Sequence, residues 1–216
     1  MALLSAPNDW IAVLGGATRC DERQLIAGYR IGREIARQGK HVITGATTGI
    51  PYAAAIGAKR EGASAVGISP AASFEEHVER FGRPLDHSDL IVYTGLGVEG
   101  RCPLIVRSAI GCIFVAGEAG TLHEFTAAWM CGNNILGVLE NFGGISGRIR
   151  DLLAELETNW GSLVLYDDEP ERLVKHVCEE VDRRHAARTR DLRTNEIGDE
   201  VRRVVTEFLA REGKES

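Results

Sequence analysis

Short apolar runs alternate along most of the chain with longer stretches of helical periodicity. Residues 112–115 are four apolar residues without a polar one between them, which is typical of a strand covered on both faces of a sheet. Comparable apolar runs predict further strands at 10–16, 41–45, 64–69, 90–94, 135–139 and 163–166. This pattern predicts that strands and helices alternate along the chain.

The stretches between these runs predict the helices. Apolar residues recur at helical spacing over 21–38, and Gly39 ends that helix. Pro51 suits the first turn of an alanine-rich helix, and Pro103 is expected to open a later one after a flexible loop at 95–101. Residues 71–88 are polar and predict a helical or irregular excursion. Two further helices are expected to end near 157 and 184.

This alternation predicts an α/β fold, a single Rossmann-like doubly wound parallel sheet of about seven strands with helices on both faces. We expect residues 1–185 to form this domain and 186–216 to form a C-terminal helical extension. An apolar stripe within the extension predicts a helix that packs on the domain or on a second subunit; it consists of Val201, Val204, Val205, Phe208 and Leu209.

Composition narrows the class of protein. With 216 residues, 44% hydrophobic and 26% charged, the chain is long enough for one sizeable core. A net charge of -6 argues against a general nucleic-acid or membrane binder, and no apolar run is long enough to span a bilayer. No basic region marks a signal peptide, and the five scattered cysteines resemble reduced thiols. We therefore expect a cytoplasmic protein.

The stretch 111–125 carries the main candidate chemistry. A buried strand is followed by a turn bracketed by Gly117 and Gly120 and by a helix that starts at Thr121. Backbone N–H groups in such a turn and the positive end of the helix dipole favour an anion, above all a phosphate. Thr121 and Glu124 also match the T-x-x-E capping box, in which Glu124 would have a purely structural role. Spacing alone leaves both interpretations open.

The remaining turns carry weaker candidate motifs. Residues 15–19 read Gly-Gly-Ala-Thr-Arg, which is not the G-x-G-x-x-G of NAD-binding proteins, and P-loop and G-x-S-x-G motifs are absent from the sequence. Thr18 and Arg19 are candidates for contact with a nucleotide, or else belong to a solvated helix-entry loop. Arg107 is expected on the exposed or interface side of its helix, and His123 on the surface of the next.

Taken together, these segments resemble a known family. The chain is similar to the LOG-like proteins of the SLOG group, which were long labelled lysine decarboxylases. The similar segments are residues 13–16, 44–50 and 67–70, an arginine at 101, and Ala-Gly-Glu-Ala-Gly-Thr-Leu-His-Glu at 116–124. The resemblance covers about 10–180. The family signature P-G-G-x-G-T-x-x-E is matched at four positions, which are Gly117, Gly120, Thr121 and Glu124.

LOG proteins are phosphoribohydrolases, which cleave a nucleoside 5′-monophosphate into free base and ribose 5-phosphate. The resemblance implies that Glu124 binds the ribose and stabilises the developing sugar cation, and that Arg101 orients the substrate or leaving group. It implies no metal ion and no redox cofactor. The implied phosphate and nucleotide contacts are Gly15, Gly16, Thr18, Gly45, Gly49, Gly117, Glu118, Ala119, Gly120 and Thr121.

The sequence departs from the signature at two positions. Ala116 replaces its proline, and Glu118 places a carboxylate where the second glycine stands, next to the expected phosphate. These departures leave open a second branch of the same group, the molybdenum-cofactor carrier proteins, which bind a phosphorylated pterin without cleaving it. The resemblance also implies a homodimer formed through the helices that flank the site.

Overall fold

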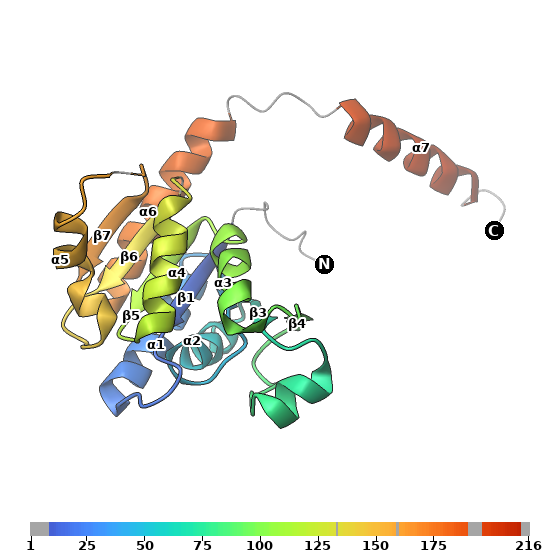
Figure 1. The fold of residues 1–216 in the computed structure, drawn as a ribbon. Helices are drawn as coiled ribbons and strands as arrows, with labels where there is room; N and C mark the ends of the chain where they lie inside the picture. The colour runs from blue at the N-terminus through green and yellow to red at the C-terminus, as the bar shows by residue number, and fades with distance from the viewer. Residues whose placement is uncertain (1–8, 133, 159, 190–195, 213–216) are drawn as a thin grey trace. The chain divides into compact units, whose positions relative to one another are not determined.

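The computed structural model describes residues 9–132, 134–158, 160–189 and 196–212. The chain divides into two compact units, Met1–Asp182 and Arg183–Ser216. The first unit contains a seven-stranded parallel sheet in the order β4-β3-β2-β1-β5-β6-β7 (Figure 1). The predicted α/β Rossmann-like architecture is confirmed.

The strands lie where the apolar runs predict them, within one or two residues at each end. Their bounds are β1 Trp10–Gly15, β2 His41–Thr44, β3 Ala65–Ser69, β4 Leu90–Tyr93, β5 Gly111–Val115, β6 Ile135–Leu139 and β7 Leu163–Asp167. Every residue of β5 and β6 is buried, as expected for central strands covered on both faces.

In the first unit, helices form a layer on each face of the sheet, whereas α7, Glu196–Glu212, belongs to the second unit. The bounds of the other helices are α1 Glu22–Arg37, α2 Gly49–Arg60, α3 Gly97–Arg107, α4 Ala119–Met130, α5 Ile149–Ala154 and α6 Pro170–Thr189. One apolar core lies between the sheet and α1, α2 and α6, and a second lies between the sheet and α3, α4 and α5. The five residues of the predicted C-terminal stripe lie on α7.

The polar segment predicted as an excursion contains a short π-helix, Glu76–Arg80. Its His77 is completely buried, with Nδ1 2.8 Å from the Ser69 hydroxyl and Nε2 3.2 Å from the Pro84 carbonyl oxygen. The imidazole thus ties the end of β3 to the loop that follows the π-helix. π-Helical turns are often found at functional sites, and this loop reaches the cleft described below.

Two predictions about helix starts are wrong. Helix α3 begins at Gly97, so Arg101 lies on a helix rather than in a flexible loop, and Pro103 lies inside that helix instead of opening it. Helix α4 begins at Ala119 with Glu118 as its N-cap residue, so Thr121 is within the helix. The T-x-x-E capping box is therefore not formed, and Glu124 is not a capping residue.

Candidate functional site

A cleft of about 350 Å³ opens at the carboxyl ends of β1, β2 and β5. The chain leaves β1 and β5 toward opposite faces of the sheet, and ligands of such folds bind at this crossover. Ten of the predicted site residues line the cleft: Gly15, Gly16, Thr18, Gly45, Arg101, Gly117, Glu118, Gly120, Thr121 and Glu124. Gly49 and Ala119 are the two that do not.

Gly49 and Ala119, which do not line the cleft, are each the first residue of a helix beside it. Gly49 is the first residue of α2, with φ of 71°, and a Cβ there would lie 2.3 Å from the Gly16 carbonyl oxygen. It therefore allows the start of α2 to pack tightly against the loop that follows β1. Ala119 is the first residue of α4 and is exposed.

The turn between β5 and α4 has a strained backbone that its neighbours hold in place. Ala116 has φ of 49° and Gly117 has φ of 78°. Proline, whose φ is fixed near −65°, could not occupy position 116 in this conformation, so Ala116 is more than a small change from the family signature. Ser146 accepts a hydrogen bond from the Ala116 N–H at 2.8 Å and donates one to the Leu139 carbonyl at 2.9 Å. The turn is thus fixed before any ligand binds.

Glu124 lies one helical turn beyond the start of α4, with its side chain buried beside the cleft. The residue is 8% exposed, and burial raises the pKa of its carboxyl from 4.5 to about 7, while the charge of Arg101 opposes that rise. The Cys102 sulfur lies 3.9 Å from Glu124 Oε1 and 3.1 Å from the Val98 carbonyl, to which it donates. A carboxyl that titrates near neutrality can exchange protons with a substrate or water.

Arg101 reaches the cleft from α3 and is only 6% exposed. Its Nη1 donates to the Ile68 carbonyl at 3.2 Å, whereas its buried Nε has no hydrogen-bond partner among the described residues. A Cβ on Gly45 would lie 1.7 Å from Nη1, so glycine is needed where the guanidinium crosses the end of β2. Desolvation lowers the pKa of Arg101. An arginine in this state is ready to receive an anion or another acceptor.

Pro103 links the helix of Arg101 to the helix of Glu124. Proline has no N–H to donate to the carbonyl four residues earlier, which is that of Glu99. That free carbonyl oxygen accepts a hydrogen bond from His123 Nε2 on α4 at 3.3 Å. The proline therefore creates a contact between the two helices that carry the candidate catalytic pair. His123 and Arg107 are both exposed, as expected.

Several residues of the cleft were not predicted from the sequence as site residues. They are Leu14, Ala17, Cys20, Gln24, Thr47, Pro51, Arg83, Val98, Cys102, Ala116 and Gly144; Arg19, weighed only as a candidate, also lines it. Arg83 is the most informative because it adds a positive charge from the polar segment 71–88 to those of Arg19 and Arg101. Its only sequence signal was an arginine next to Pro84 in a region of no clear periodicity.

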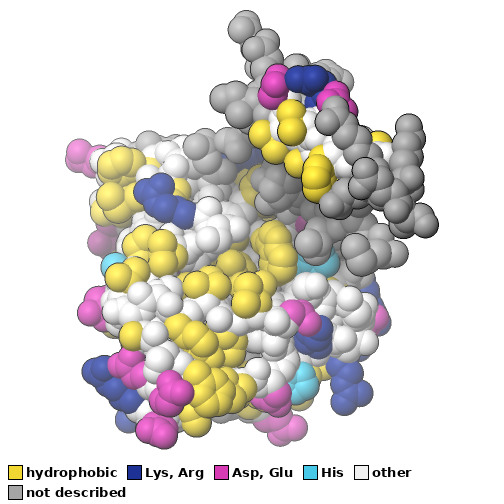
Figure 2. All heavy atoms as spheres, turned by 90° about the vertical axis from the view of Figure 1, so that its right-hand side faces the viewer, with side chains coloured by type: hydrophobic (Ala, Val, Ile, Leu, Met, Phe, Trp, Pro, Cys, Tyr) yellow, Lys and Arg dark blue, Asp and Glu magenta, His cyan; other side chains and the backbone are white. Residues whose placement is uncertain are grey.

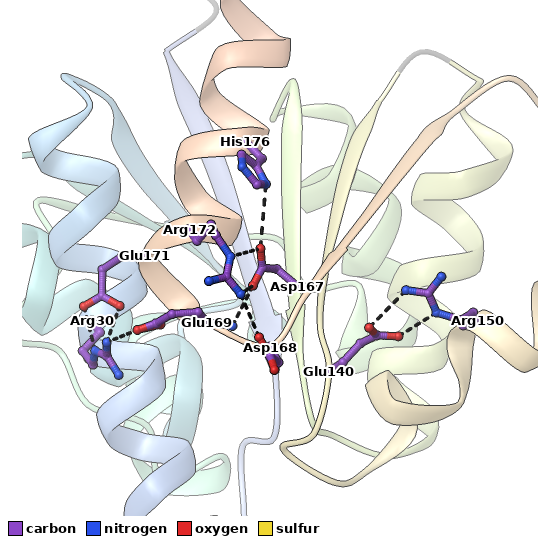
Figure 3. A network of polar contacts seen from close by, with 9 residues as sticks. All are labelled: Arg30, Glu140, Arg150, Asp167, Asp168, Glu169, Glu171, Arg172 and His176. Atoms are coloured by element: carbon purple, nitrogen blue, oxygen red, sulfur yellow. Dashed lines mark hydrogen bonds and ion pairs between the residues drawn. The ribbon is translucent and has the colours of Figure 1, made fainter.

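A second group of charged residues lies away from the cleft, around the end of β7 and the start of α6 (Figure 3). Arg30 contacts both Glu169 and Glu171, and Arg172 binds Asp167 with Nε at 2.7 Å. These charges are neutralised by their own neighbours, unlike those of the cleft.

Comparisons with known proteins agree with this architecture. The model of the SLOG cluster4 family matches residues 9–174. An uncharacterized protein of Archaeoglobus fulgidus is 32% identical over 120 residues, which are 56% of this chain and 74% of that protein.

Two solved structures have the same fold. The molybdenum cofactor binding protein from Rippkaea orientalis has a TM-score of 0.67 at 24% identity, over 81% of this chain and 98% of that one. The molybdenum cofactor carrier protein from Chlamydomonas reinhardtii has a TM-score of 0.65 at 23% identity, over 81% and 98%. Since the family model matches most of the chain, the protein belongs to the SLOG cluster4 family.

Proposed function

We propose that the protein is a nucleoside 5′-monophosphate phosphoribohydrolase, which releases a free base and ribose 5-phosphate. The observation that carries this proposal is that Arg101 and Glu124, a buried guanidinium and a buried carboxyl, line the same cleft. The family resemblance assigns catalysis to the same two residues, and the fold brings them to one cleft from different helices.

The turn and helix start supply the phosphate site of this proposal. Gly117, Gly120 and Thr121 line the cleft where α4 begins, and free N–H groups at a helix start attract a phosphate. Glu118 is exposed at the rim of this turn, so its carboxylate has room to face solvent when a phosphate is bound. The phosphate then holds the sugar with its anomeric carbon toward Glu124.

The reaction breaks the bond between the anomeric carbon and the base nitrogen, and the bonding electrons leave with the base. Positive charge develops on the sugar, and the Glu124 carboxylate stabilises it, as carboxylates do in glycoside hydrolysis. Water adds to the anomeric carbon and passes a proton to Glu124, and this proton then goes to the departing base, which restores the Glu124 carboxylate. Arg101 donates hydrogen bonds to the base and orients it as it leaves.

The test is a product screen with purified protein. AMP, GMP, CMP, UMP, IMP and their deoxy forms are incubated separately, and free base is measured by chromatography. Glu124→Ala is expected to lower base release by about 10³-fold because it removes the charge that stabilises the transition state. The matched control is Glu140→Ala, which removes a carboxylate that pairs with Arg150 outside the cleft. Normal turnover by Glu124→Ala would contradict the proposal.

A second candidate is a carrier that binds a phosphorylated ligand without cleaving it. The structural similarity to molybdenum cofactor carriers and the carboxylate of Glu118 at the phosphate turn favour it. Under this function no nucleotide releases its base, while a phosphorylated ligand raises the melting temperature. Glu118→Gly is then expected to tighten ligand binding, since a repulsion of about 1 kcal/mol or more disappears.

The proposal includes a homodimer. Leu90 and Val92 on β4 are exposed. Their neighbours on β3 are Val66 and Ile68, which face the α3 side of the sheet. Leu96, the N-cap residue of α3, and Leu104, within α3, are exposed as well. Figure 2 shows apolar side chains gathered on the face of the molecule that includes β4 and α3. Such a face supports a contact between copies.

The proposal also keeps the cytoplasm as the expected location. The thiols of all five cysteines are free, which suits a reducing compartment. Across the described part of the chain, none of the helices is long and apolar enough to cross a membrane.

A further inference from the structure

The guanidinium of Arg101 is buried without a counter-ion in contact. Within the described residues it forms no ion pair, and its Nε lacks a hydrogen-bond partner. Thr47 also lines the cleft and is 7% exposed, and its buried hydroxyl oxygen likewise has no hydrogen-bond partner among the described residues. Burying such groups without partners costs free energy, so a ligand that satisfies both is the simplest explanation for their retention.

Arg83 adds a second guanidinium to the same wall of the cleft. Its Nη1 donates to the Thr48 hydroxyl at 3.0 Å, and that hydroxyl donates to the Ala17 carbonyl at 2.7 Å. The Arg83 N–H donates to the carbonyl of the buried His77 at 3.1 Å. Arg83 is therefore held in position, half buried, with donors left over, and no ion pair to it occurs in the described parts of the chain.

These groups gather at the ends of β2 and β3, away from the phosphate turn. Thr47 and Thr48 follow β2, and the Arg101 guanidinium crosses the end of β2 at Gly45 and binds Ile68 of β3. The phosphate turn follows β5, which is separated from β2 by β1. Two strand spacings amount to about 10 Å, too far for one phosphate to contact both regions.

We propose that Arg83, Arg101 and Thr47 form a second anion-binding subsite, and that the ligand carries a second anionic group, on its base or its sugar, apart from its 5′-phosphate. This inference rests on the proposed function for the placement of that phosphate. It names the substrate class as nucleotides with a carboxylate on the base or a second phosphate. Two guanidiniums and a hydroxyl suit both groups, because each offers several acceptor oxygens to forked donors.

The experiment compares nucleotides in pairs that differ by the second anion. Orotidine 5′-monophosphate is paired with UMP, and nicotinate mononucleotide with nicotinamide mononucleotide; these pairs test a base carboxylate. Adenosine 3′,5′-bisphosphate is paired with AMP to test a second phosphate. Affinity is measured by calorimetry, and base release is measured in parallel. In at least one pair, the member that carries the second anionic group is expected to bind about 10- to 100-fold more tightly than its partner.

The variants assign that preference to the subsite. Arg83→Gln and Thr47→Val are each expected to reduce the affinity ratio of the preferred pair, to less than about threefold for Arg83→Gln. Arg107→Gln, which removes an exposed arginine from α3, is the matched control and should leave the ratio unchanged. Thr47→Val keeps the shape of the side chain, so it remains informative where Arg83→Gln proves unstable by its thermal midpoint.

The outcomes separate this inference from the proposed function. Preference for the second anion without base release supports the subsite and overturns the hydrolase. Base release with equal affinities within every pair supports the hydrolase and overturns the subsite. A preference that survives both variants, or an absence of binding by any of these nucleotides, overturns the subsite as well.

Discussion

Arginines occur in two contrasting settings in this protein. Arg30 lies on α1 with its side chain 38% exposed, and it contacts the carboxylates of Glu169 and Glu171. Arg101 lies on α3 and is 6% exposed. The charge of Glu124 acts on it from nearby, but Arg101 forms no ion pair with any of the described residues. The same side chain is thus neutralised by the fold in one region and left unneutralised in the other.

The contrast distinguishes charges that serve the fold from charges kept for a ligand. A partly exposed ion pair contributes up to about 1 kcal/mol, because water already solvates both partners well. A buried charge without a partner is destabilising, so its retention requires a benefit other than stability. This benefit is the ligand binding proposed above, since Arg83 and Arg101 line the cleft whereas the neutralised charges lie around β7 (Figure 3).

The largest expected effect on stability concerns the ionisation of Glu124. Its pKa in the folded protein is about 7, above its ordinary 4.5, so between these values the folded protein holds a proton that the unfolded chain has released. The free energy of unfolding should therefore fall as pH rises from 4.5 to 7, by on the order of 3 kcal/mol from this group. The Glu124→Gln variant should not show this fall in the free energy of unfolding, because glutamine does not ionise.

Urea denaturation of both proteins at pH 5, 6, 7 and 8 measures this effect. Groups common to the two proteins cancel in the difference between their free energies of unfolding. That difference should grow in favour of Glu124→Gln as pH rises toward 8. A difference that is flat with pH would show that Glu124 is solvated rather than buried.

A smaller effect is expected from removing Arg101 itself. Arg101→Met replaces a buried, unneutralised charge with an apolar side chain, so the free energy of unfolding should rise by about 1 to 2 kcal/mol while nucleotide binding is lost. Arg30→Met should instead lower the free energy of unfolding by about 1 kcal/mol and leave binding unchanged. If the two variants were equally destabilised, the proposed distinction between the two regions would be wrong.

The smallest expected effect lies within the neutralised region. Asp167 accepts hydrogen bonds from Arg172 Nε at 2.7 Å and from the Glu169 N–H at 2.8 Å, and Arg172 holds the pKa of this carboxyl below its ordinary value. Asp167→Asn should lower the free energy of unfolding by about 1 kcal/mol at pH 7, because the charge-assisted bond weakens. The loss should shrink as the pH falls through the pKa of Asp167, and a change in nucleotide affinity would contradict a purely structural role.

Local pattern predicted much of the fold. A buried parallel strand must be apolar on both faces, and glycine or proline marks many of the boundaries, so the seven strands could be located from residue order alone. The cleft glycines in the turns after β1, β2 and β5 were also predictable, because a strand that ends in a glycine turn before a helix has a definite position in such a sheet. Arg101 and Glu124 came from the family resemblance.

Helix starts were harder to predict because the same short sequence pattern fits more than one starting residue. Thr121-x-x-Glu124 reads as a capping box, yet the helix begins two residues earlier, and this leaves the Glu124 side chain free to face the cleft. Pro103 reads as a helix opener, yet it sits inside α3, where His123 from another helix binds the carbonyl oxygen that the proline leaves free. Neither outcome can be found without knowing which helices pack together.

Sequence order by itself determined the class of fold and the edge of the sheet at which the cleft lies, because apolar periodicity and glycine turns are properties of neighbouring residues. Tertiary structure alone decided which charges would be neutralised. Arg83 joins Arg101 in the cleft because the buried His77 holds its loop against Ser69, and Arg30 finds its carboxylates on an element about 140 residues away along the chain. Electrostatic interaction depends on distance and burial in space, and neither quantity is a property of the sequence order.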